Sequence, residues 1–128
     1  MQIHQSAEDY LETILMLTQR MGRVRSIDVV NELGYTKASV SIAMKKLREN
    51  GYIAVDGEGN LTLLEPGREI AERIYSRHRL LTHFFVQLGV DEEVAAEDAC
   101  KAEHILSEQT LEKIREYTLL HDAQDSVK

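Results

Sequence analysis

Residues 26–64 constrain the fold more than any other stretch of the chain. A basic amphipathic run, ASVSIAMKKLRENG, ends at Gly51 and is followed directly by two short β-rich runs, YIAV and NLTLL. The DGEG between them is a turn sequence that suits a hairpin. A shorter run of helical periodicity, IDVVNELG, precedes the basic run and ends at Gly34. Two helices joined by a tight turn and followed by a hairpin predict a winged helix-turn-helix.

The segment before this unit predicts one more helix. Apolar residues recur at helical spacing from Tyr10 onward, Ser6 resembles the N-cap, and Gly22 ends the pattern after Met21. Ser26 in turn resembles the N-cap of the short second helix.

The second half of the chain predicts helices only. Pro66 opens a long amphipathic helix of about residues 66–88, and two further helices follow at roughly 91–106 and 108–120, with a loose tail of about six residues. We therefore expect a mainly α protein. Its predicted domains are a winged helix-turn-helix DNA-binding domain with a small β-hairpin wing in residues 1–65 and an all-helical domain in residues 66–128. The helical half carries more apolar surface than so small a domain covers, which predicts a homodimer.

The distribution of charge predicts a nucleic-acid partner. The 128 residues carry a net charge of −7, which alone argues against DNA binding. Residues 20–50, however, hold seven basic side chains against three acidic ones, and a local basic segment of this kind suits a phosphate backbone. No window is apolar enough to span a membrane, no signal peptide is expected, and one cysteine cannot form an intramolecular disulfide. We expect a cytoplasmic DNA-binding protein with no membrane partner and no enzymatic activity.

Potential metal ligands cluster in the stretch CKAEH. Cys100, Glu103 and His104 stand at i, i+3 and i+4, which places them on one face of a helix. Thiolate, carboxylate and imidazole are all ligands for divalent transition metals. Three further candidates lie on two other predicted helices: Asp9, Glu12 and His78.

Each candidate also has a purely structural explanation. Asp9 fits the third position of a capping box, and Glu12 fits a solvated helix face. A lone cysteine such as Cys100 is more often a small buried hydrophobe than a ligand. Glu103 fits a solvated position, and His78 stands between two arginines, where a basic surface cluster competes with metal binding. From spacing alone, both interpretations stay open.

Four motifs, in this order, resemble the diphtheria toxin repressor family: SAEDYLETILML, KASVSIAMKKLRENGYI, YSRHRLLTHFFVQLGVD and ACKAEHILS. The resemblance covers about residues 6–120. This family comprises metal-dependent bacterial transcription regulators, among them iron-sensing repressors and manganese transport regulators. It implies a homodimer with an N-terminal winged-helix domain and a helical metal-binding and dimerisation domain. Many members add an SH3-like third domain, which we do not expect in this protein.

The resemblance implies a ligand set. The manganese-type ligands fall on Asp9, Glu12, His78, Glu103 and His104. At the position of Cys100 the manganese regulators have glutamate, whereas the iron-sensing repressors have cysteine there and methionine at the position of Asp9. Any second metal is expected to use Glu12 and His78 with Glu103 as a bridge. The thiolate favours iron(II) over manganese(II), with zinc(II) and cobalt(II) as further ions in vitro.

The third helix is expected to read DNA. The candidate contacts, by position and residue type, are Arg25, Thr36, Lys37, Ser39, Ser41, Ile42, Lys45 and Lys46. Some iron repressors place glutamine where this chain has Ile42, so we expect an apolar contact to thymine methyl groups there. Lys45 and Lys46 suit phosphate contacts or a solvated face.

The predicted function is a metal-dependent DNA-binding transcriptional regulator. The resemblance implies a homodimeric repressor of iron or manganese uptake genes, activated by Fe(II) or Mn(II), on an inverted-repeat operator. Metal ligands from both halves of the chain would set the spacing of two recognition helices in major grooves about 34–36 Å apart. One alternative is a winged-helix regulator that senses redox state or a small ligand through Cys100. The other is a helical di-metal enzyme, which leaves the basic third helix and the wing unexplained.

Overall fold

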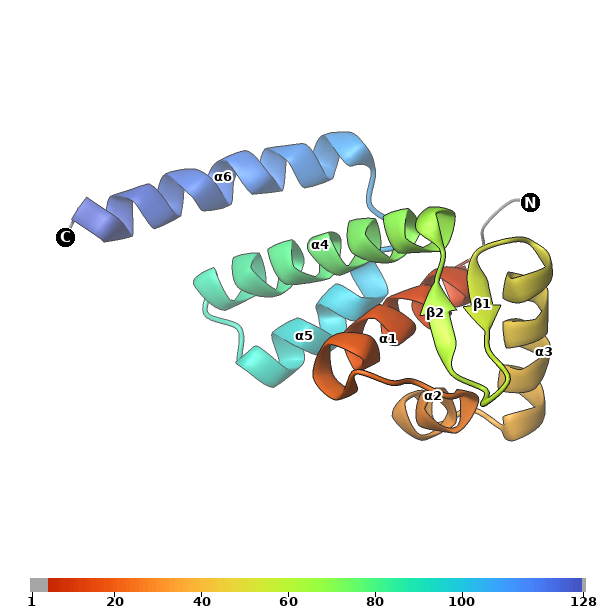
Figure 1. The fold of residues 1–128 in the computed structure, drawn as a ribbon. Helices are drawn as coiled ribbons and strands as arrows, with labels where there is room; N and C mark the ends of the chain where they lie inside the picture. Colours follow the sequence, from red (N-terminus) through yellow and green to blue (C-terminus); the bar gives the residue numbers. More distant parts are fainter. Residues whose placement is uncertain (1–4, 128) are drawn as a thin grey trace. The chain divides into compact units, whose positions relative to one another are not determined.

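The computed structural model describes residues 5–127, except for the side chains of residues 124–127. Its elements are α1 (Gln5–Met21), α2 (Ser26–Leu33), α3 (Lys37–Glu49), β1 (Ile53–Val55), β2 (Leu61–Leu63), α4 (Glu65–Gln87), α5 (Glu92–Ala102) and α6 (Glu108–Val127) (Figure 1). The predicted mainly α fold with a hairpin wing is confirmed. The chain divides into two compact units between Arg73 and Ile74, inside α4. The domain boundary between residues 65 and 66 stays a prediction.

Helices α2 and α3 form the predicted helix-turn-helix. Gly34 ends α2 with a left-handed φ of 72°, and its N–H donates to the carbonyl of Val30. Thr36 begins the next helix as its N-cap, because its hydroxyl accepts a hydrogen bond from the backbone N–H of Ser39 at 3.1 Å. Val40 on α3 is fully buried and contributes to the core.

Two predicted N-caps are wrong. Arg25, rather than Ser26, occupies the N-cap position of α2, and the carboxylate of Asp28 accepts a hydrogen bond from the Arg25 backbone N–H at 2.9 Å. Asp28, at the third position of the helix, accepts a hydrogen bond from the backbone N–H of the N-cap residue, so the start of α2 does not require a serine as its N-cap. Ser6 lies inside α1, which already includes Gln5.

The wing is a tight antiparallel hairpin in which Ile53 pairs with Leu63. Asp56 organises its turn, because one carboxylate oxygen accepts hydrogen bonds from the backbone N–H groups of Glu58 and Asn60, both at 2.9 Å. The bonds from Asn60, first from its backbone and then from its side chain, lower the pKa of the Asp56 carboxyl group. The predicted DGEG turn is therefore held by its first residue.

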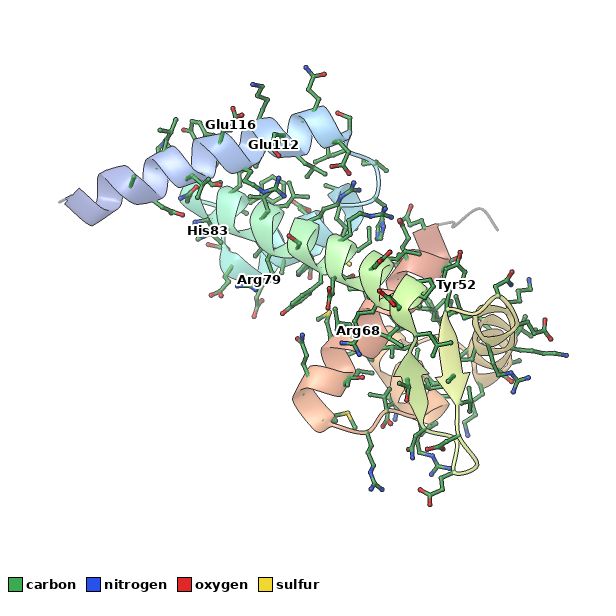
Figure 2. All side chains as sticks on the ribbon, turned by 45° about the horizontal axis from the view of Figure 1, so that its top comes forward. Tyr52, Arg68, Arg79, His83, Glu112 and Glu116 are labelled. Carbon is green, nitrogen blue, oxygen red and sulfur yellow. The ribbon has the colours of Figure 1, made fainter. Side chains whose placement is uncertain are left out.

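The core of the first unit forms around α1, where Leu11 and Ile14 are fully buried. The start of α4 comes very close to the wing: a Cβ atom at Gly67 would lie 2.2 Å from the carbonyl oxygen of Tyr52. Tyr52 and Arg68, the residue after Gly67, are labelled in Figure 2. Only glycine permits this approach of α4 to the end of α3 and the start of β1.

In the second unit, α5, α6 and the later part of α4 share a small core of Leu81, Ala99 and Leu111. Figure 1 shows α6 alongside α4. The rings of Phe84 and Tyr117 pack edge to face between these two helices, with centroids 5.7 Å apart. No described helix is long and apolar enough to cross a membrane.

The two last helices differ from their predicted bounds. Helix α5 ends at Ala102 instead of near residue 106, because Ser107 caps α6 by accepting a hydrogen bond from the Thr110 N–H, and a turn must separate the two helices. The expected loose tail is helical to Val127. Asp122 helps to hold this end of α6 on α4, since its carboxylate accepts a hydrogen bond from Gln87 at 2.8 Å and lies 3.0 Å from His83 Nε2.

Candidate metal centre and DNA-binding face

Three predicted metal ligands meet in the second unit. His78 on α4 places its Nδ1 atom 3.0 Å from Glu103 Oε2. His104 places its Nε2 atom 3.4 Å from Glu103 Oε1. The side chains of Glu103 and His104 are 0% and 1% exposed. Two imidazoles thus approach the two oxygens of one buried carboxylate.

The chemistry of this cluster fits a divalent metal. Oε1 of Glu103 is buried and accepts no hydrogen bond from the part of the chain that the structure describes. A buried carboxylate oxygen without a hydrogen bond is costly, and a bound cation would remove that cost. Imidazole nitrogen and carboxylate oxygen together suit first-row ions such as manganese(II), iron(II) and zinc(II).

The turn after α5, rather than a continued helix, presents Glu103 and His104. Glu103 is the C-cap of α5 and keeps helical dihedral angles, with φ −60° and ψ −23°. The prediction that Cys100, Glu103 and His104 lie on one face of a single helix is therefore wrong, although all three follow one another closely at this end of α5. Cys100 lies on α5 and is exposed, so it is not the buried hydrophobe of the structural explanation. Its role as a ligand stays a prediction.

Two further candidate ligands, both carboxylates, lie in the first unit. Asp9 and Glu12 lie one turn apart on α1, and Glu12 is only 5% exposed, which contradicts a solvated helix face. Because α1 includes Gln5, Asp9 does not hold the third position of a capping box. Neither structural explanation therefore accounts for these two residues.

Tyr10, next to Asp9, links α1 to the start of α3. Its ring packs edge to face against Tyr35, with centroids 5.8 Å apart, and Tyr35 directly precedes the N-cap of α3. Burial raises the pKa of the Tyr10 hydroxyl, and the charges of Tyr35 and Asp9 raise it further. The helix that carries two candidate ligands is thus in direct contact with the turn before α3.

The predicted DNA contacts form an exposed surface. The exposed residues are Arg25, Thr36, Lys37, Ser39, Ser41, Ile42, Lys45 and Lys46. Met44 and Leu47 on the opposite side of α3 are buried, so the helix separates a core face from a free face. Ile42 is 58% exposed within the basic face, whereas the hydroxyl of Thr36 is engaged in capping α3. Contact of these residues with DNA stays a prediction.

Sequence reasoning missed Arg77. Its side chain is only 14% exposed, and its guanidinium group reaches the turn that carries Glu103 and His104. A signal was present, because positions 74, 77, 78 and 81 lie on one face of α4, and Ile74 and Leu81 on that face are apolar. An arginine on a buried face needs a specific partner.

Two family models match consecutive parts of the chain. The N-terminal DNA binding domain of the iron dependent repressors matches residues 2–61. The metal binding and dimerisation domain of the same repressors matches residues 64–120. The chain belongs to the iron-dependent repressor family. This is the diphtheria toxin repressor family that the four motifs predicted, and that prediction is confirmed.

Relatives in this family match most of the chain. An uncharacterized HTH-type transcriptional regulator of Methanocaldococcus jannaschii is 36% identical over 113 residues, which are 87% of this chain and 90% of that protein. The HTH-type transcriptional regulator MntR of Bacillus subtilis is 32% identical over 123 residues, 96% of this chain and 87% of that protein. A solved manganese-dependent transcriptional repressor in complex with manganese has a TM-score of 0.77 and 29% identity, and the match covers 84% of this chain.

The chain spans only 50% of the length of this manganese-dependent repressor. Members of the iron-dependent repressor family bind divalent metal through the domain matched here. The comparisons do not support the predicted preference for iron(II) over manganese(II), since that solved relative is manganese-dependent.

Proposed function

We propose that the protein is a homodimeric, metal-activated repressor that binds an inverted-repeat operator of iron or manganese uptake genes. One observation carries this proposal: the buried carboxylate of Glu103 lies between the imidazoles of His78 and His104, in a chain whose other unit is a winged helix with an exposed basic face. As such a regulator, the protein would act in the cytoplasm. The proposal includes no catalytic residue.

The proposed ligands are Asp9, Glu12, His78, Cys100, Glu103 and His104. The burial of Glu12 and Glu103 supports this set, because buried carboxylates are rare unless they are paired or coordinate a metal. A bound divalent cation supplies the positive charge that balances them. Since the set draws on both units, we propose that bound metal fixes one unit relative to the other.

We propose that this arrangement is the one that binds DNA. In a homodimer, two α3 helices enter major grooves separated by about one helical turn of DNA. Lys45, Lys46 and Arg25 neutralise phosphates, while Ser41 and Ile42 face base edges. Metal that favours the DNA-binding arrangement strengthens DNA binding, and DNA strengthens metal binding by the same factor.

Exposed apolar side chains support a homodimer. Those on α4, α5, α6 and the turns that follow α4 and α5 include Val86, Leu88, Val94, Ile105, Leu119 and Leu120. So many exposed large apolar side chains on one small unit are typical of an interaction surface. The self-complementary interface of a symmetric dimer would cover them on both copies.

We propose manganese(II) or iron(II) as the activating ion, with zinc(II) and cobalt(II) binding in vitro. Cys100 is the one soft donor in the proposed set. Cys100→Glu replaces it with a hard donor and is expected to raise the affinity for manganese(II) relative to that for iron(II). Anaerobic titrations of both proteins with each ion measure this ratio, and an unchanged ratio would exclude Cys100 as a ligand that selects the metal.

Calorimetric titration of the metal-free full chain with manganese(II) tests the ligand set. Glu103→Gln keeps the size of the side chain but removes its charge, and it is expected to weaken binding by at least about tenfold. Glu112→Gln on α6 is the matched control, because Glu112 is exposed (Figure 2), and it is expected to leave the affinity unchanged. Equal affinities of Glu103→Gln and the wild type would contradict the proposed site.

A DNA-binding assay with chelator and with oxidant separates the other functions. Loss of DNA binding in chelator supports the metal-activated repressor. Binding that ignores chelator but responds to oxidant would indicate a redox regulator acting through Cys100. Absence of DNA binding under all conditions would leave the helical di-metal enzyme.

A further inference from the structure

Arg77 and His78 are consecutive residues of α4, and both contact Glu103. His78 approaches the carboxylate, at 3.0 Å from Oε2, while Arg77 Nη1 donates a hydrogen bond to the backbone carbonyl of Glu103 at 3.2 Å. Glu103 is the C-cap of α5, where helix carbonyls lack partners within the helix. Arg77 thus donates to a carbonyl that has no partner within α5. Glu103 is contacted at its main chain by Arg77 and at its side chain by His78.

The second arm of the guanidinium group reaches α6. Arg77 Nη2 forms an ion pair with Glu108, the first residue of α6. One side chain therefore bonds both ends of the turn that joins α5 to α6, Glu103 at its start and Glu108 at its end. The two partners differ in exposure: the Glu103 side chain is fully buried, while that of Glu108 is 79% exposed.

We infer that Arg77 is a positioning residue that holds the turn of Glu103 and His104 ready for a divalent cation. This inference rests on the proposed metal site. Fixing the peptide between Glu103 and His104 holds the backbone from which both side chains project, so less ordering is left for the moment of binding. Groups that orient the ligands of a metal typically change its affinity by about 10- to 100-fold.

Positioning by Arg77 would strengthen metal binding, whereas its positive charge alone would weaken it. A guanidinium group repels a cation, so an arginine that acted only through its charge would weaken metal binding, and its removal would strengthen it. Arg79 provides the comparison, because it flanks His78 on the other side, carries the same charge and is exposed on α4 (Figure 2). Its guanidinium group lies 5.9 Å from the ring of Tyr75.

The test is manganese(II) affinity of the full-length, metal-free protein by calorimetry. Arg77→Met is expected to weaken binding by about 10- to 100-fold, and Arg77→Lys, which keeps one donor but not the fork, by less. Arg79→Met is expected to leave the affinity unchanged or to raise it slightly. Far-ultraviolet circular dichroism and urea unfolding of each metal-free variant establish whether it is folded, and Arg77→Lys carries the test if Arg77→Met is not.

The outcomes separate the inference from the function on which it rests. If Glu103→Gln weakens manganese(II) binding and the folded Arg77 variants bind like the wild type, Arg77 only stabilises packing and the inference is wrong. Stronger binding by both Arg77→Met and Arg79→Met would indicate a charge effect and would also overturn it. If Glu103→Gln binds like the wild type, the proposed metal site itself fails.

Discussion

Gly67 lies where the first turn of α4 passes the carbonyl oxygen of Tyr52. Gly67→Ala places a methyl carbon 2.2 Å from that backbone oxygen, which cannot move without the wing. We expect the free energy of unfolding to fall by about 1–3 kcal/mol, as in overpacked cores. Urea unfolding measures the change. Gly57→Ala is the matched control, because a Cβ at that position meets nothing within 4 Å, and a loss of equal size there would contradict the packing argument.

Asp56 predicts a pH dependence of the wing. Its pKa is lowered in the fold, chiefly by the bonds from Asn60, so the stability it contributes is present above the ordinary value of 3.8 and is lost as the pH falls through the lowered value. Asp56→Ala should therefore destabilise the protein at neutral pH, and the difference from the wild type should shrink in acid. Urea midpoints across pH measure this. Asp56→Asn, which keeps one acceptor oxygen, should lose less, and a difference independent of pH would refute the assignment.

Single residues divide into those that the sequence could identify and those it could not. His78, Glu103 and His104 carry metal-binding chemistry in their side chains, which identifies them as candidates, although spacing alone leaves the structural explanations open as well. Gly67 carries no such signal, and the position of Arg77 on the apolar face of α4 indicates that it is buried but not what it contacts. The role of each depends on one backbone oxygen, of Tyr52 or of Glu103, that the fold brings close. Periodicity along a helix does not predict which carbonyl lies opposite a side chain.

Among the elements, α3 offers a simple test at its N-terminus. Thr36 caps α3 through its hydroxyl, so Thr36→Val removes the cap at nearly constant size and is expected to cost about 1 kcal/mol. Thr36→Ser keeps the hydroxyl and should stay close to the wild type. Urea unfolding without DNA measures both. Equal stability of the valine and serine variants would show that the cap contributes nothing.

At the level of elements, the winged helix and the start of α6 were predictable from the sequence, whereas the end of α5 was not. Gly34 and the DGEG turn are strong local signals, and the observed helix end and hairpin follow them. Between α5 and α6 the chain has no glycine or proline to mark the break, and helix-forming residues continue through the turn. The capping bond of Ser107 decides the position of the break. The same limit explains why the sequence predicts a loose tail where α6 is helical to Val127.

For the whole molecule, the proposed function requires energetic coupling between metal and DNA. Each unit on its own is explained by its local structure: one is a winged helix with a basic face, and the other is a small helical core around a buried carboxylate. The local structure of each unit does not explain why one chain contains both a winged helix and a helical unit with candidate metal ligands. Coupling between two sites typically amounts to about 1–3 kcal/mol, which is about 5- to 150-fold in affinity.

That coupling can be measured directly. A DNA duplex selected from a random pool by the manganese-loaded full-length protein serves as the operator, and fluorescence anisotropy then measures its affinity with manganese(II) and with EDTA at the same ionic strength. Metal-dependent repression predicts that EDTA weakens binding by about 5- to 150-fold and that Glu103→Gln binds equally weakly in both conditions. Equal affinity of the wild-type protein in manganese(II) and in EDTA would contradict the account.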